Sequence, residues 1–199
     1  MVFLPGCAPV FSDLQSAKLV GKGKFEATPS FSSVYFSSDG ETDHVQNHFG
    51  LQVAYGMGNN VDFRLRFERI NVDIDGDESF SVNVLGFGPK IGTEKGRVAL
   101  CLPIGFAFGE DVEVSETWEF HPTLLFTLPI GNNFEFNPSA KALIPLNREG
   151  SDVLVAFNLG AGISANLKKW VIRPELGFLF NPGEDGHYRH FSIGFTIYL

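Results

Sequence analysis

Apolar and polar residues alternate one by one along ten short segments of this chain. In segment 61–68, the apolar side chains Val61, Phe63, Leu65 and Phe67 occupy every second position. Successive side chains of an extended strand point to opposite faces, so this pattern predicts a strand with one apolar face. The same pattern predicts strands at 24–36, 47–57, 61–71, 79–92, 97–108, 117–130, 134–146, 153–166, 169–180 and 189–199.

The connections between these strands alternate between tight turns and longer loops. Tight turns rich in Gly, Asn and Lys are predicted at 58–60, 93–96, 131–133 and 166–168, and longer loops at 37–46, 72–78, 109–116, 147–152 and 181–188. Strict alternation places every tight turn, with both chain termini, at one end of a barrel. Short turns at one end and long loops at the other are typical of transmembrane barrels. We therefore predict one closed antiparallel up-and-down β-barrel domain of about ten strands over residues 24–199.

The residue types on the two faces favour a membrane barrel over a soluble one with an apolar interior. The polar face carries mostly small residues, such as Asn158, Gly160 and Ser192, which suit a crowded lumen. The apolar face is rich in Phe, Leu and Ile. Aromatic residues also gather near strand ends, as in the interfacial girdles of membrane barrels. These are Tyr55, Phe134 and Trp170 beside tight turns, and Tyr35, Trp118 and Tyr188 beside long loops.

Composition excludes several other classes of protein. The chain has no run of roughly 18 apolar residues, which excludes a transmembrane helix. Its net charge of −8 argues against a nucleic-acid partner. Prolines in mid-strand, among them Pro29, Pro122, Pro138 and Pro174, are the main irregularity. Because proline cannot donate to a strand ladder, we expect these residues on the lipid face, at bulges.

The two chain ends resemble motifs of bacterial envelope proteins. Leu4-Pro5-Gly6-Cys7 resembles a lipobox, which implies lipidation of Cys7 on the periplasmic side and makes residues 1–23 a signal remnant and tether. The terminal residues 192–199 resemble the last-strand signal of small outer-membrane β-barrel proteins, although Leu199 replaces the usual aromatic. This resemblance implies a bacterial outer-membrane location with both termini periplasmic. It also implies contact with outer-membrane lipids, and with the barrel-insertion machinery during assembly.

Charged residues on the polar face are the best candidates for chemistry. Such groups persist in a narrow lumen only when they are paired and hydrogen-bonded, so we expect an ion-pair network. A narrow selective pore lined by the same groups is the sharper alternative. The predicted network comprises Glu26, Arg64, Arg66, Glu68, Glu119, His121, Glu135, Lys141, Arg173 and Glu175.

The long loops are acidic, which favours cationic partners or ion-bridged contacts with lipid headgroups. Residues 71–76 follow the start of a calcium loop, but Val82 stands where the motif needs Glu, so no metal site is predicted. His187 and His190 flank the last loop near Asp185, the minimum for a hydrolase at the rim, yet no nucleophile motif accompanies them. We expect Cys101 to be a cysteine that packs in the interior.

We expect no cofactor and no enzymatic activity. The predicted role is structural, or is binding through the acidic loops. A soluble lipoprotein barrel that binds an apolar ligand is the alternative.

Overall fold

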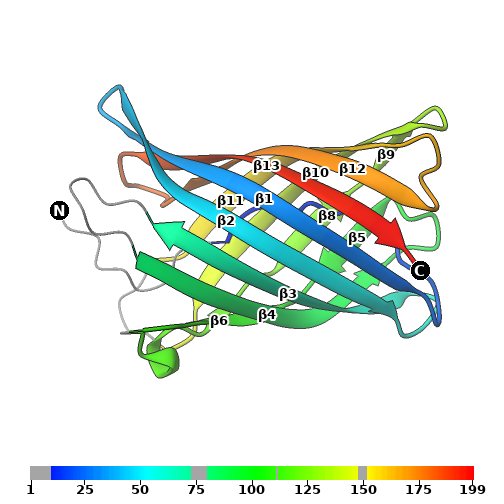
Figure 1. The fold of residues 1–199 in the computed structure, drawn as a ribbon, viewed down its shortest axis with the longest axis horizontal. Coiled ribbons are helices and arrows are strands. Elements are labelled where there is room, and N and C mark those ends of the chain that lie inside the picture. Colours follow the sequence, from blue (N-terminus) through cyan, green and yellow to red (C-terminus); the bar gives the residue numbers. More distant parts are fainter. Residues whose placement is uncertain (1–9, 73–79, 111, 148–151) are drawn as a thin grey trace.

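The computed structural model describes residues 10–72, 80–110, 112–147 and 152–199. These residues form a closed antiparallel β-barrel, seen from the side in Figure 1. The last strand, β13 (His187–Tyr198), pairs with the first, β1 (Phe25–Ser38), and so closes the ring. In the described part of the chain, no helix is long and apolar enough to cross a membrane.

The strands of the ring follow one another in sequence order. Six more are continuous: β2 (Glu41–Gly56), β3 (Val61–Val72), β4 (Phe80–Gly92), β10 (Phe134–Pro145), β11 (Leu154–Ile163) and β12 (Trp170–Phe180). The other two are interrupted, one as β5 (Val98–Cys101) and β6 (Ile104–Phe108), the other as β7 (Glu119–Phe120), β8 (Thr123–Phe126) and β9 (Leu128–Ile130). A 3₁₀ turn, η1 (Val114–Glu116), lies in the loop between them.

The interrupted segments are parts of single barrel strands, and two of the three interruptions lie at Pro103 and Pro122, which cannot donate to a ladder. The pairing register with β4 and with β10 is the same on both sides of Pro103 and of Pro122. The barrel therefore has ten strands, which confirms the predicted count and topology. The predicted bulges are wrong, because the ladders pass Pro29, Pro138 and Pro174 without a shift in register.

The loop predicted at 37–46 is instead a projecting hairpin. Strands β1 and β2 extend to a two-residue turn at Asp39 and Gly40, whose φ angles are 54° and 84°. Two positive φ values in a two-residue turn match the twist of the flanking strands. A register shift between Val34 and Tyr35 marks the base of this hairpin, which extends beyond its neighbours at the upper left of Figure 1.

The outer face of the barrel is apolar and the lumen is polar. Leu51, Leu159 and Leu176 point outward with 45%, 53% and 53% of their surface exposed, whereas Thr28 and Ser192 are buried inside. A soluble barrel for an apolar ligand needs the opposite arrangement, so the structure contradicts that alternative.

Aromatic side chains lie near both ends of the outer face. Tyr55 pairs with Phe25 beside a tight turn, and Trp118 packs on Phe106 near the long loops. Tyr188 is an exception, because its ring packs against the buried cluster inside the loop-side mouth. Its predicted place in a girdle is therefore wrong.

The outward apolar band generates a prediction on stability. We expect Leu159→Arg to lower the free energy of unfolding from lipid vesicles by about 2–4 kcal/mol, because the charge would face hydrocarbon near mid-strand. Glu41→Arg, at an exposed position of the projecting hairpin, is the control and should change it by less than about 0.5 kcal/mol. Urea titration in vesicles measures both values, and an equal effect of the two variants would contradict a lipid-facing Leu159.

Candidate functional site

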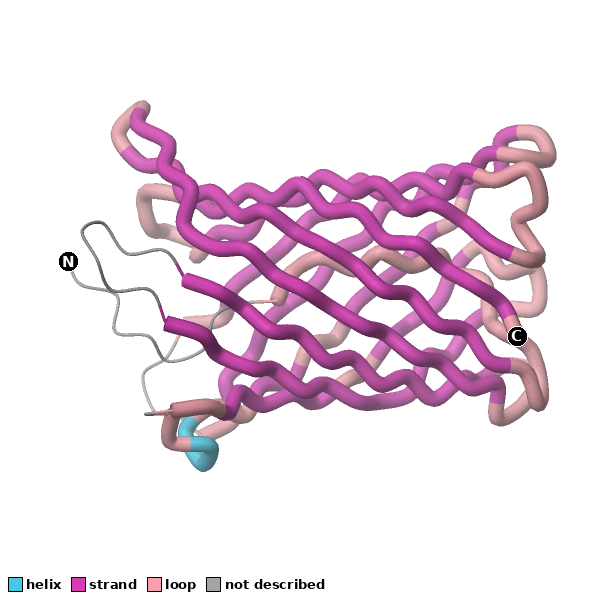
Figure 2. Tube along the Cα trace, viewed as in Figure 1, coloured by secondary structure: helices cyan, strands magenta, loops and turns pink. Residues whose placement is uncertain are grey.

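The lumen is filled by the chain's own N-terminal segment. Residues 10–20, here called the strap, enter the barrel without regular secondary structure and run along its length, as Figure 2 shows in the loop colour. Phe11, Leu14 and Ala17 are almost completely buried. The described part of the segment predicted as a tether thus lies inside the barrel, where it contacts the inward side chains of many strands.

Glu175 is the main anchor of the strap. Its two carboxylate oxygens accept hydrogen bonds from the backbone N–H groups of Asp13 and Leu14, at 2.7 and 2.8 Å. Leu14 adopts a φ of 51°, a left-handed conformation that is unfavourable for a leucine. Because two successive N–H groups must converge on one carboxylate, the bond to Glu175 provides the physical reason for this conformation.

Charged groups of the wall and the strap neutralise one another. Lys141 forms an ion pair with Asp13 at 2.8 Å, and Lys18 of the strap contacts Glu135 at 2.5 Å. Lys90 donates to the backbone carbonyls of Ser16 and Lys18 at 3.0 and 2.7 Å. Wall lysines therefore bind strap oxygens that would otherwise be buried without partners.

The strap leaves the lumen at the tight-turn end. The N–H of Val20 donates to Asp62 at 2.9 Å, and that of Gly23 donates to the carbonyl of Gly56 at 2.8 Å. Gly21 has a φ of 94°, which lets the chain reverse into β1. A Cβ at position 56 would lie 1.9 Å from the Gly21 carbonyl oxygen, so only glycine fits there.

The two ends of the described chain therefore lie toward opposite ends of the barrel. The N–H of Leu199 donates to the Phe25 carbonyl at the tight-turn end. Val10 lies near Ala107 and Thr117, toward the long loops. The strap thus begins, at residue 10, toward the long loops, whereas the described C-terminal end lies at the tight-turn end; residues 1–9 lie outside the described part of the chain.

All ten predicted network residues point into the lumen. Eight of them form four pairs: Arg64 with Glu26 at 2.7 Å, Arg66 with Glu68 at 2.7 Å, His121 with Glu119 at 2.7 Å, and Arg173 with Glu135 at 3.0 Å. The other two, Lys141 and Glu175, bind the strap instead. Glu119, His121 and Arg66 are less deeply buried than the other seven.

The histidines predicted at the rim do not share a site. His190 is buried in the lumen, where its ring nitrogens contact Ser192 at 2.6 Å and Asn158 at 3.0 Å. Ser, His and Asn are residue types found in hydrolases, but Ser192 has no exposed surface and the Phe11 ring lies 4.6 Å from that of His190. His187 lies apart, in the pocket under the last loop.

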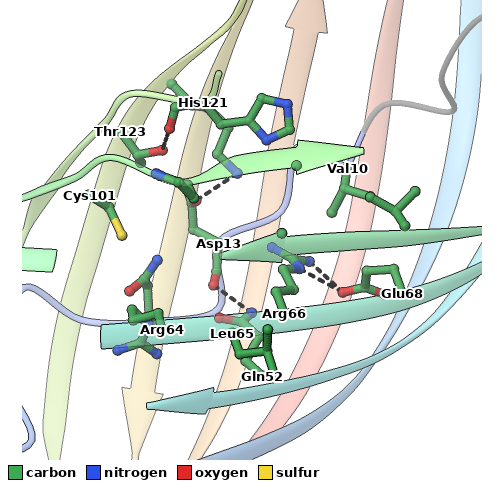
Figure 3. A pocket seen from close by; sticks show the side chains of 16 residues that line it. Val10, Asp13, Gln52, Arg64, Leu65, Arg66, Glu68, Cys101, His121 and Thr123 are labelled. Carbon is green, nitrogen blue, oxygen red and sulfur yellow. Dashed lines mark hydrogen bonds and ion pairs between the residues drawn. The ribbon is translucent and has the colours of Figure 1, made fainter. Parts of the chain in front are cut away.

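A small cavity remains between the strap and the part of the wall that includes β3, β4 and β8. Its volume is about 60 Å³, enough for a few water molecules. Arg64, Arg66 and Thr123 line it, and Figure 3 shows the Arg66 guanidinium directed at Glu68. One guanidinium nitrogen of Arg64 has no hydrogen-bond partner among the described protein atoms. Water in this cavity would satisfy it.

Sequence reasoning missed the residues that join the strap to the wall. Lys90 and Asp62 lie on the inward phase of predicted strands, so alternation alone could have identified both. Asp13 and Lys18 carry no periodic signal. Cys101 is buried with Ala17 and Leu125, in agreement with a packing role. Cys7 and most of 71–76 lie outside the described residues.

The buried pair of Lys141 and Asp13 generates a second prediction. Asp13→Ala leaves the Lys141 ammonium buried without its counter-ion, so we expect the free energy of unfolding in vesicles to fall by about 3–5 kcal/mol. The double variant Asp13→Ala with Lys141→Met should lose clearly less, because the uncompensated charge is gone. The exposed Glu113→Ala serves as the control. Additive losses in the double variant would contradict the pairing.

No protein-family model matches the chain, and no curated protein matches its sequence. Among solved structures, it is similar to the COG4313 outer membrane channel from Pseudomonas putida F1, with 11% identity over 94% of this chain and 100% of that one, at a TM-score of 0.54. Its structural likeness to Ail, the attachment invasion locus protein of Yersinia pestis, is weaker, with a TM-score of 0.44 and 14% identity over 89% of this chain and 99% of that one. Neisserial surface protein A matches with a TM-score of 0.41 and 10% identity over 88% of this chain and 99% of that one. The likeness to the Pseudomonas channel, together with the closed antiparallel barrel, shows that the chain has the fold of outer-membrane β-barrel proteins.

Proposed function

We propose that this protein is a barrel of the bacterial outer membrane, closed by its own N-terminal strap, and that it acts by binding at its long-loop end. The strap carries this proposal. With Asp13 and Leu14 bound to Glu175, and Lys18 to Glu135, the strap occupies the lumen beside the ion-pair network. The remaining surfaces are the lipid-facing wall and the loops.

The outward apolar band supports residence in a lipid bilayer. Its exposed residues, such as Phe157 and Leu159, would aggregate in water but match hydrocarbon. In outer-membrane barrels the short turns are periplasmic and the long loops face outward. The orientation proposed here follows that rule and places Leu199, which ends the strand read by the insertion machinery, in the periplasm.

The distribution of charge supports a cationic partner at the loop end. Exposed carboxylates lie there, at Asp39, Glu41, Asp43, Glu113, Glu116, Glu184 and Asp185. The tight-turn end instead exposes Lys95, Arg97, Lys168 and Lys169. An acidic outer rim attracts cations and repels nucleic acid.

Electrical recording tests the closed state. The full chain in planar bilayers should show no unitary currents. Asp13→Ala with Glu175→Ala, which removes two strap anchors, should produce openings because the polar lumen then fills with water.

Steady currents through the unaltered protein would contradict the closed state. If the ion selectivity of these currents also changed with Arg66→Glu, the protein would be a narrow selective pore instead of a closed barrel. Heat-modifiable gel mobility of every variant is the control for barrel folding.

A further inference from the structure

A pocket of about 110 Å³ opens at the long-loop end, apart from the ion-pair network. Phe36 of β1, Leu154 of β11 and Tyr188 of β13 form its walls. The segment 181–186, which joins β12 to β13, covers it. None of these residues takes part in holding the strap's charged groups, so the pocket needs an explanation of its own.

The walls of this pocket are preformed. The rings of Phe36 and Tyr188 pack with their centroids 4.9 Å apart. Gly186, with a φ of 89°, lies so close to the first ring that a Cβ there would be 2.9 Å from the Phe36 Cζ. The covering segment is held by a bond from the Glu184 N–H to the Asn181 carbonyl at 3.1 Å. A ligand would therefore pay little for ordering this site.

The floor of the pocket is apolar. Leu179 has no exposed surface and packs in one cluster with Phe11, Val34, Leu143 and Ala156. Leu179 therefore lies between the pocket, which it lines, and the buried apolar cluster around Phe11.

Size and charge define the class of ligand. An apolar cavity of about 150 Å³ holds benzene, so this slightly smaller, open pocket accepts a single ring or a branched group of similar size. The carboxylates of Glu184 and Asp185 also line it and are exposed to solvent. Aromatic faces beside carboxylates attract a positive charge.

We propose that this pocket binds a small organic cation, with an apolar ring against Phe36, Leu154 and Tyr188 and an ammonium group near Glu184 and Asp185. The site rests on the proposed function, because it supplies the ligand class for binding at the loop end. Arg189 does not line the pocket, and its guanidinium is held away at the hydroxyls of Ser37 and Thr42, at 2.5 and 2.7 Å.

Calorimetric titration of the full chain in lipid nanodiscs tests the site, with benzylamine, benzyl alcohol and benzoate as probes. Affinity should fall in that order, since the ring is shared and the charge of its substituent changes from positive through neutral to negative. Leu154→Phe fills the pocket and should weaken benzylamine binding about tenfold or more, the equivalent of about 1.4 kcal/mol. Leu176→Phe, on the lipid face, is the matched control and should leave binding unchanged.

A second pair of variants tests the charge. Glu184→Gln with Asp185→Asn should weaken benzylamine binding about two- to fivefold, in the range of an exposed cation–π or ion-pair contact, and leave benzyl alcohol unaffected. Glu113→Gln with Glu116→Gln removes two exposed carboxylates from another loop and should have no effect. Equal effects of the two pairs would show attraction by net charge alone and would overturn the proposed site.

Recordings on the same preparations separate this inference from the proposed function. If the barrel does not conduct and binds none of the probes, only the proposed pocket is overturned. The same holds if it does not conduct and the Leu154→Phe and Leu176→Phe variants bind the probes with equal affinity. A conducting barrel overturns the closed state whether or not benzylamine binds.

Discussion

Pairing of buried charge in a narrow closed ring is the constraint on which the rest of this structure depends. Ten strands enclose a lumen in which charged groups find little water, so each one needs a partner. The wall alone does not supply all of them. Lys141 and Lys90 are satisfied by Asp13 and by strap carbonyls, and Glu175 by strap N–H groups. Wall and strap are therefore energetically interdependent.

This dependence explains the conformation of the strap. The segment has no regular hydrogen bonding of its own, and its backbone polar groups bond to inward side chains instead. The left-handed Leu14 and the close contact at Gly56 are local costs of fitting an irregular chain into a lumen built from regular strands. At the loop end the apolar layer around Phe11 covers the polar network. Through Leu179, it also forms the floor of the pocket between Phe36 and Tyr188.

The barrel could be predicted because apolar and polar residues alternate regularly along its strands. Alternation in 61–68 sets which side chains face the lumen, and a closed ring forces the same phase on every neighbour. The sequence alone therefore places Arg64 and Glu26 in the lumen, although the pairing between them depends on register. The strap has no period, and Asp13 meets Lys141 across more than 120 residues, so no local signal reveals it. The hairpin at Asp39 was missed because its acidic residues resemble those of a loop.

The central claim is that the strap lies inside the barrel, and a thiol cross-link tests it most directly. In a Cys7→Ser background, Ala17→Cys places a thiol in the buried cluster that contains Cys101. Oxidation of the folded protein in vesicles should join positions 17 and 101, as peptide mass spectrometry would show, and the thiol at 17 should resist a bulky aqueous maleimide beforehand. Rapid labelling at 17 in the heat-modifiable, folded barrel, without a link to 101, would contradict the account.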